Sequence, residues 1–332
     1  MSTSVAPSLT VASAAGPSHS PTQSFFEDPL HLRTILVPVD FSDTSLRALE
    51  FAAPLAQRFG AAIHLVYVFD GHRQFSGISN AHFLLSDTQI VLLLKKEVQR
   101  KYPFSLGEEN CHIRCGKAFQ EIADVAHEIK ADLVVMTTHG YGGWKHLTLG
   151  STAERVVQHA DCPVLVVRDG SRASIKNAQE GIVLEKILVP VDFSECAQEG
   201  AKYASVFATG VGASLLLAHI IHPPDYTGAG GYTGGVDWAP LADRTLAEAE
   251  DFLDELVNSL PLTNVAAETT VEFGVPIYNL VDLTERSDID LVITSTHGFT
   301  GLRHALIGST AEYLVRCAHC PVLVVPSHRR RA

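Results

Sequence analysis

Short apolar runs alternate along the chain with longer segments whose apolar residues recur at helical spacing. The first run, Thr34–Val39, is almost continuously apolar, which is typical of a parallel strand covered on both faces. Asp40 breaks the run, and Ser42 or Asp43 can cap a helix whose apolar positions follow. Gly60 then provides a helix stop. This strand, polar turn and helix form the first unit of the predicted fold.

The same alternation continues through the rest of the first half. Further strands are expected at 63–68, 111–115, 133–137 and 164–167, and helices at 88–102, within 116–129, and at 151–160. The second half repeats this order. Strands that alternate with helices, without hairpin signals between them, indicate βαβ units and parallel sheets. Because the pattern restarts fully at Ile187, we expect an α/β fold with two separate five-stranded parallel sheets, one in each half.

Two sequence segments occur twice. ILVPVDFS at Ile35–Ser42 returns unchanged at Ile187–Ser194, and THGYGGWKHLTLGSTAE at Thr138–Glu154 is answered by THGFTGLRHALIGSTAE at Thr296–Glu312. Only the second copy carries a Gly-rich insertion, at 226–238. The repeats divide the chain into a disordered tail (1–30), a first domain (31–168), a linker (169–183), a second domain (184–327) and a basic tail (328–332).

The composition restricts the class of protein. The chain has 332 residues, of which 46% are hydrophobic, enough for two buried cores. With 25 Lys and Arg against 37 Asp and Glu, the net charge of −12 argues against nucleic acid or an anionic membrane as a partner. No apolar run is long enough to span a membrane, and the N-terminal tail lacks the basic start of a signal peptide. Six cysteines in so long a chain do not suggest a disulfide framework, so we expect a cytoplasmic location.

The strongest chemical signal is a Gly-rich loop in each copy, with the pattern G-x9-G-S-T. It runs from Gly140 to Gly150-Ser151-Thr152 and, in the second copy, from Gly298 to Gly308-Ser309-Thr310. Glycines let backbone amides approach an anion, and a helix that begins at the serine directs its first amides and its positive dipole end at the loop. The pattern favours a phosphate site. An ordinary turn followed by an N-cap serine is the structural alternative.

In combination and order, these motifs resemble the universal stress protein family in its tandem form. The resemblance rests on VPVDFS, on THG-x9-GSTAE, on the turns at Gly116–Ala118 and Gly274–Pro276, and on CPVLVV at Cys162–Val167 and Cys320–Val325. It implies two Rossmann-like, doubly wound domains, and a stress-response sensor or regulator that binds adenine nucleotide, ATP, with or without Mg²⁺. It also implies that the two VLVV strands lie together where the halves pair as an intramolecular pseudo-dimer. A homodimer is the further assembly considered.

The nucleotide-binding positions of the family carry over onto matching residues of both copies. An aspartate at the end of the first strand matches the acid near the nucleoside, and the residue at the end of the second strand approximates the position whose backbone meets adenine. The expected nucleotide-binding residues are Asp40, Val68, Thr137, His139, Gly140, Gly150, Ser151 and Thr152 in the first copy, and Asp192, Ile220, Ser295, His297, Gly298, Gly308, Ser309 and Thr310 in the second.

One position departs from the family pattern G-x2-G-x9-G-[ST]. Thr137 and Ser295 replace its first glycine. If that position requires a positive φ angle, a β-branched threonine is strained there. If it requires only a small residue, serine is the better substitute. We therefore expect the second copy to be the better nucleotide site.

Other groups give weaker signals. The two strand-end aspartates can also be local helix-capping partners, and His139 and His297 can simply orient the loop. Cys317-Ala-His-Cys320 lies at a helix C-terminus, where a reactive thiolate is disfavoured, and Cys111-His112-x2-Cys115 does not supply the four ligands of a zinc site. No catalytic residue or protein-bound metal is assigned. The alternatives are a slow Mg²⁺-dependent ATPase or phosphotransferase that uses the two aspartates, and a nucleotide-free protein-interaction module.

Overall fold

A computed structural model describes residues 30–69, 86–102, 106–138, 150–168, 183–222, 239–296 and 307–327. The strands and helices expected in the first half are present, with bounds within two residues of the predicted ones. They are β1 (Thr34–Val39), α1 (Asp43–Phe59), β2 (Ala62–Phe69), α2 (Asp87–Lys101), β3 (Cys111–Cys115), α3 (Ala118–Glu128), β4 (Leu133–Thr137), α4 (Ser151–His159) and β5 (Val164–Val167).

The second half repeats the element order of the first. It contains β6 (Lys186–Pro190), α5 (Glu195–Val211), β7 (Ser214–Ile221), α6 (Ala239–Ser259), β8 (Ala267–Phe273), α7 (Pro276–Arg286), β9 (Leu291–Ser295), α8 (Ser309–Cys317) and β10 (Val322–Val325). The first helices of the two halves begin and end by the same means. Ser42 and Ser194 cap α1 and α5 through their side chains, and Gly60 and Gly212 end these helices in the left-handed conformation.

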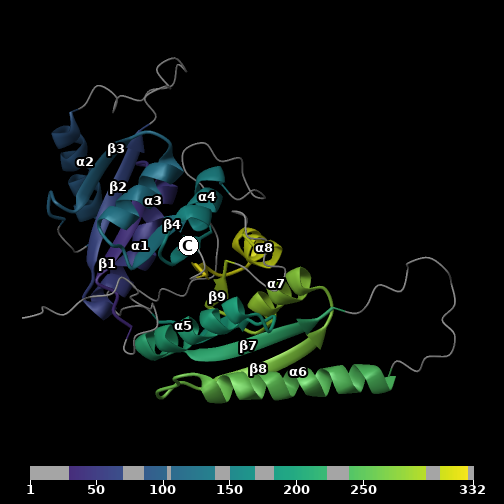
Figure 1. Cartoon of the computed structure of the whole chain (residues 1–332). Coiled ribbons are helices and arrows are strands. Elements are labelled where there is room, and N and C mark those ends of the chain that lie inside the picture. The colour runs from purple at the N-terminus through teal and green to yellow at the C-terminus, as the bar shows by residue number, and fades with distance from the viewer. Residues whose placement is uncertain are drawn as a thin grey trace, which may run out of the picture.

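The strands form one sheet in the order β3-β2-β1-β4-β5-β10-β9-β6-β7-β8. Within each half all neighbouring strands are parallel, as predicted. β5 and β10 pair antiparallel, with Leu165 opposite Leu323, so the VLVV strands meet as expected. The expectation of two separate sheets is corrected, because the halves join edge to edge into a ten-stranded sheet (Figure 1). Pairing satisfies the backbone groups of two apolar edges that would otherwise be open.

Helices cover both faces of this sheet and enclose two core clusters. α1, α2, α5 and α6 contribute to one cluster, and α3, α4, α7 and α8 contribute to the other. Side chains alternate along the strands, so that Ile35 and Val37 of β1 belong to the first cluster and Leu36 to the second. Both clusters contain residues from both halves. The molecule is therefore a doubly wound α/β protein whose two repeats share their cores.

Contacts outside the sheet also connect the halves. Arg58 at the end of α1 donates from Nε to the carbonyl oxygen of Gly210 in α5 at 2.9 Å. Arg168 after β5 donates from Nη1 to the carbonyl oxygen of Ala318 after α8 at 2.8 Å. The aromatic ring of Phe59 lies 6.4 Å from that of Phe207, centroid to centroid. These contacts support the intramolecular pairing of the two domains.

Some predictions fall on residues that the structure does not describe. The tail, the linker and the basic tail lie outside the described residues, apart from Leu30 and Val183 at their borders. The Gly-rich insertion at 226–238 also lies outside them. Within the described part of the chain, no helix combines the length and the apolar character that crossing a lipid bilayer requires.

Candidate functional site

In each half, two neighbouring strands separate at the position where the order of strands across the sheet reverses its direction. β1 lies between β2 and β4, so the chain builds outward from it in both directions. β1 pairs with β2 along six residues but with β4 only at Ile35 and Leu36, although β1 runs on to Val39 and β4 to Thr137. Such a topological switch point is where open α/β sheets bind ligands, beyond the carboxyl ends of the strands.

The second half shows the same opening. β6 pairs with β9 only at Ile187 and Leu188, and both strands then continue, to Pro190 and Ser295. The candidate residues gather at these two openings. Asp40 follows β1 and Thr137 ends β4, while Asp192 follows β6 and Ser295 ends β9. The structure therefore brings the predicted aspartate and the first-glycine position to opposite sides of one switch point in each half.

A rigid turn holds each aspartate at the strand end. Oδ1 of Asp40 accepts hydrogen bonds from the backbone nitrogen of Ser42 at 3.0 Å and from its Oγ at 2.5 Å. The same Ser42 Oγ accepts from the nitrogen of Ser45 and thereby caps α1. Phe41, between them, has a φ of 63°, a left-handed conformation that is costly for a bulky residue. The predicted capping partnership of the aspartate is thus present.

The equivalent turn in the second half is less enclosed. Asp192 Oδ1 accepts from the nitrogen and Oγ of Ser194 at 3.2 and 2.6 Å, and Phe193 has a φ of 64°. In the first half the backbone nitrogen of Asp40 also donates to Ser45 Oγ, whereas Ala197 takes the place of that serine in the second. Asp192 is exposed, and Asp40 is half-buried.

Aromatic rings support the left-handed residue in both turns. The ring of Phe41 meets Tyr67 edge-on at 5.0 Å, and Phe193 stacks on His219 at 4.0 Å. Nδ1 of His219 lies 2.8 Å from the carbonyl oxygen of Val191, which fixes the imidazole beneath the turn. Sequence reasoning did not assign a role to the two phenylalanines. The exact repetition of DFS in both copies was the available signal.

The helices that follow the Gly-rich loops start without a side-chain cap. Gly150 is the N-cap of α4 and Gly308 that of α8, and neither helix has a side-chain capping hydrogen bond among the described residues. Because the first amides of a helix have no intrahelical acceptor, the first turns starting at Ser151 and Ser309 can donate to an anion. Thr152 and Thr310 occupy the second position of these turns.

The loop ends are anchored to the sheet in the same way in both halves. The nitrogen of Gly150 donates to the carbonyl oxygen of Thr138 at 2.9 Å, and the nitrogen of Gly308 donates to that of Thr296 at 2.8 Å. Thr138 and Thr296 are themselves bonded through their nitrogens to the last residues of β5 and β10. Both threonines are buried. They fix the helix N-terminus against the strand ends, a role that the repeated THG motif signalled but sequence reasoning did not assign.

The two residues at the first-glycine position are ordinary strand residues. Neither Thr137 nor Ser295 is among the described residues with positive φ, so threonine is not strained there. Thr137 is buried, and Ser295 is half-buried. Gly200 of α5 lies directly beside Ser295, since a Cβ placed on it would come within 3.5 Å of the serine nitrogen. Its repeat equivalent in the first half is the buried Ala48, so the second opening is lined by smaller residues.

The remaining predicted residues are placed only in part. Val68 and Ile220 each stand one residue before the end of the second strand of their half, and both pack against the core cluster of the α3 face. His139, Gly140, His297 and Gly298 lie outside the described residues.

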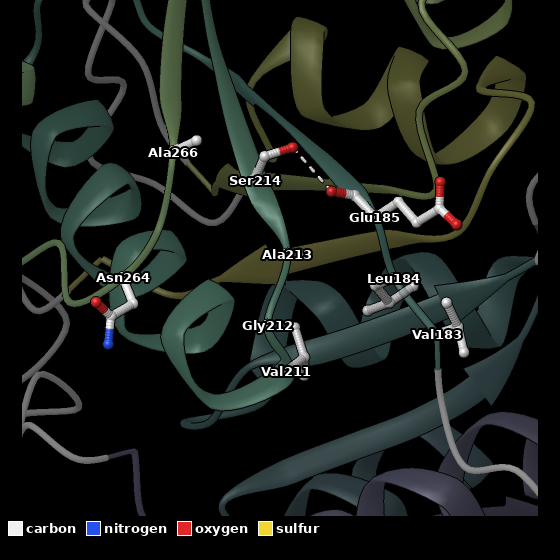
Figure 2. Close-up of a pocket in the computed structure, with 9 residues that line it drawn as sticks. All are labelled: Val183, Leu184, Glu185, Val211, Gly212, Ala213, Ser214, Asn264 and Ala266. Atoms are coloured by element: carbon white, nitrogen blue, oxygen red, sulfur yellow. Dashed lines mark hydrogen bonds between the residues drawn. The ribbon is translucent and has the colours of Figure 1, made fainter.

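A hollow of about 490 Å³ lies at the amino ends of the strands, opposite the candidate sites, where β6, β7 and β8 begin. Leu184, Val211 and Asn264 are among the residues around it, and Ser214 Oγ donates to the carbonyl oxygen of Glu185 in its wall (Figure 2). The hollow is open to solvent and contains none of the predicted residues. The openings at the strand carboxyl ends are the better candidate because they combine anion-binding amides with fixed carboxylates.

The described residues include all six cysteines and most of the side chains that could bind a metal ion. The six cysteines are free thiols, and burial raises the pKa of Cys162 and of Cys320 to about 12. A raised pKa keeps these two buried thiols protonated and unreactive. No group of three or more His, Cys, Asp or Glu side chains in the described ranges is arranged to hold a metal ion.

Comparison with known proteins places this fold. The model of the Universal stress protein family matches residues 31–168 and 184–326. Universal stress protein MJ0531 of Methanocaldococcus jannaschii is 29% identical over 156 residues, 47% of this chain and 89% of that protein. Universal stress protein G of Escherichia coli O157:H7 is 33% identical over 148 residues, 41% of this chain and 99% of that protein. The crystal structure of a universal stress protein from Archaeoglobus fulgidus DSM 4304 aligns with 89% of this chain and 97% of that chain, with a TM-score of 0.61 and 19% sequence identity. The similarity is one of fold, and it includes both halves.

Proposed function

The chain belongs to the universal stress protein family and carries two copies of its domain, and from this premise we propose that it binds adenine nucleotide, ATP, at the switch point of each half. We further propose that nucleotide occupancy makes it a stress-response sensor or regulator. The free thiols support a cytoplasmic location for this role.

One observation carries the proposal. In each half the strands part at the switch point, and an uncapped helix N-terminus lies beside the parting strands. The amides at Ser151 and Ser309 suit phosphate oxygens, because the helix dipole and unpaired donors act together on a negative charge. The backbone at Val68 and Ile220, near the ends of the second strands, is proposed to meet the adenine. The sugar then lies between base and phosphates, on the side of Asp40 and Asp192.

The second half is proposed to be the stronger site. Ser295 and Gly200 leave more room than Thr137 and Ala48, and Asp192 is more exposed than Asp40. Each difference is about the size of one methyl group or one hydrogen bond. We therefore expect two binding steps of unequal affinity rather than an all-or-none difference.

The test is a calorimetric titration of the full chain with ATP and Mg²⁺, using Ser151→Asp and Ser309→Asp. Aspartate in a first helical turn is compatible with the helix, so both variants should fold. The new carboxylate repels phosphate and should weaken its own site about tenfold or more, since about 1.4 kcal/mol corresponds to tenfold. Thr88→Asp is the matched control, because it adds the same charge to the first turn of α2, a helix that packs on the edge strand β3. Absence of binding at millimolar ATP would contradict the proposal.

The ATPase alternative is separated by the same variants. Phosphate release is measured at saturating ATP for the unmodified chain and for the Ser151→Asp, Ser309→Asp double variant. A binding protein gives release at the background rate in both cases. Turnover that is clearly above background and disappears in the double variant would favour the slow Mg²⁺-dependent enzyme.

A further inference from the structure

Two histidines face each other on neighbouring strands at one end of the sheet. His64 belongs to β2 and His112 to the edge strand β3 (Figure 1). Nδ1 of His64 lies 3.0 Å from Nε2 of His112, and the rings are within 14° of parallel with their centroids 5.3 Å apart. The two nitrogens therefore meet head-on, and the contact is a hydrogen bond between the rings. One nitrogen carries the proton, and the other offers its lone pair.

This hydrogen bond tolerates one extra proton but not two. In the neutral pair the donor ring has its lone pair on the far nitrogen, so a first proton can add there and leave the facing N–H in place. The acceptor ring already carries hydrogen on its far nitrogen, so a second proton must add to the facing nitrogen. Two N–H groups would then point at each other across 3.0 Å. Full protonation therefore breaks the contact and places two like charges on neighbouring strands.

The second half has the same strands without this pair. The equivalent places in the repeat are held by Leu216 of β7 and Thr270 of the edge strand β8. An edge strand of this fold therefore does not need two imidazoles to stay paired with its neighbour. Because leucine and threonine do not titrate, β8 is an internal reference for the behaviour of β3.

The groups around the pair also oppose full protonation. Burial lowers the pKa of both histidines, and the neighbouring imidazole and Arg114 of β3 lower the pKa of His112 further. Glu109, in the turn before β3, and Glu128, at the end of α3, act in the opposite direction. Glu128 is itself paired with Arg114, and Glu121 of α3 lies beside the turn that follows β3. The carboxylates near the pair thus do not outweigh its desolvation.

We propose that the hydrogen-bonded pair of His64 and His112 is an acid-sensitive latch that holds the edge strand β3 on β2. At neutral pH the shared proton joins the two strands. In acid the second added proton breaks this contact, and β3 opens from β2 more often. Opening uncovers the backbone groups of β2, which then becomes an unpaired strand edge. The latch acts on the first half and does not depend on nucleotide binding.

The direction of the pH dependence follows from counting protons. In the opened state each imidazole takes up a proton near the ordinary histidine pKa of about 6.5. In the closed state the pair holds at least one proton fewer, because its pKa values are lowered. The latch therefore contributes its full stability above about pH 6.5 and loses it as the pH falls towards the lowered pKa. One proton of difference raises the opening constant by up to about tenfold per pH unit.

The experiment measures amide hydrogen exchange of the full chain near pH 7.5 and near pH 5.5, with each rate corrected for the intrinsic pH dependence of exchange. The amides that bond β3 to β2 are compared with those that bond β8 to β7. Between the two pH values the opening constant of β3 should rise about tenfold more than that of β8. Nitrogen-15 NMR of the imidazoles should show the pair taking up its two protons in separate steps, the second below the ordinary histidine pKa.

Two variants remove the second proton in different ways. His112→Gln keeps a neutral side chain that can accept from a protonated His64, and His64→Leu, His112→Thr installs the residues that the second half already accommodates. In both, acid should open β3 no more than β8. His127→Gln is the matched control, because this exposed histidine near the end of α3 pairs with Asp161 instead, and its loss should leave the response of β3 unchanged.

The proposal is overturned if acid opens β3 and β8 of the unmodified chain equally. It is also overturned if the folded His112→Gln protein keeps the acid response of the unmodified chain, or if both imidazoles titrate together in one step at the ordinary histidine pKa. The NMR titration decides the question in the unmodified chain, whatever the stability of the variants.

Discussion

Two glycines of α5 provide a direct test of how the second half is packed. Gly200 and Gly210 lie in the same helix, ten positions apart, but they meet different surroundings. A Cβ on Gly200 would touch the nitrogen of Ser295 at 3.5 Å and its Cβ at 3.6 Å, which is ordinary van der Waals contact. A Cβ on Gly210 would come within 2.7 Å of the ring of Phe59, across the junction between the halves. We expect Gly200→Ala to stabilise the protein and Gly210→Ala not to.

The size of each effect follows from these distances. Replacing glycine by alanine inside a helix stabilises the folded state by about 0.5–1 kcal/mol, because alanine reduces the conformational freedom of the unfolded chain. At Gly200 the new methyl group is also buried, which adds about 0.8 kcal/mol, so the total is about 1–2 kcal/mol. At Gly210 the ring of Phe59 must move, and overpacking of this kind costs about 1–3 kcal/mol, which cancels or exceeds the helical gain. Ala48, the repeat equivalent of Gly200, shows that the first half already accommodates alanine.

The assay is urea unfolding of the unmodified chain and the two variants, followed by circular dichroism. We expect the highest midpoint for Gly200→Ala and a midpoint for Gly210→Ala that is equal to or below that of the unmodified chain. A Gly200→Ala protein less stable than the unmodified chain would mean that the space beside Ser295 is smaller than the structure indicates. Equal shifts in both variants would mean that Phe59 does not press on α5, and the junction between the halves would have to be reconsidered.

Three further predictions concern single groups. Tyr203 is buried, and its hydroxyl has no hydrogen-bond partner among the described residues. Tyr203→Phe should therefore raise the free energy of unfolding by about 1 kcal/mol in a urea titration. A lower free energy of unfolding would show that the hydroxyl has a partner. Ser194→Ala removes the cap of α5 and should cost about 1 kcal/mol, with faster amide exchange confined to the first turn of α5 as the readout; unchanged exchange there would contradict the capping role. Because burial raises the pKa of Cys162 and Cys320 to about 12, a thiol reagent at pH 8 should miss these two thiols in the folded chain and reach them after unfolding; rapid reaction in the folded state would be the contrary result.

Much of the fold was predictable because its signals are local. The near-continuous apolar run before Asp40 indicated a buried parallel strand, and the structure confirms β1 at Thr34–Val39. Ser42 and Gly60 bound α1 through a side-chain cap and a left-handed residue, as their chemistry indicated. The duplicated motifs indicated two copies of one unit, and the same element order occurs twice. Capping, periodicity and turn chemistry each depend on a few neighbouring residues, so sequence alone can reveal them.

The candidate site was predictable as a set of residues but not as a geometry. The motifs named Asp40 and Ser151, yet only the strand order places the ends of β1 and β4 on either side of one switch point. The repeated DFS and THG motifs marked Phe41 and Thr138, but a repeated motif does not reveal a left-handed φ angle or a loop-anchoring hydrogen bond. The meeting of His64 with His112 was equally invisible, since the two lie on different strands whose register the sequence does not state.

By itself the sequence determined the repeat, the βαβ alternation and the two Gly-rich motifs, because each depends on residues that are neighbours along the chain. The tertiary structure decided that the halves share one ten-stranded sheet, because the pairing of β5 with β10 satisfies backbone groups that are far apart in sequence. It also decided that Gly200 faces Ser295 and that two imidazoles meet at 3.0 Å. Such contacts depend on long-range packing, which brings together residues that are far apart in the sequence.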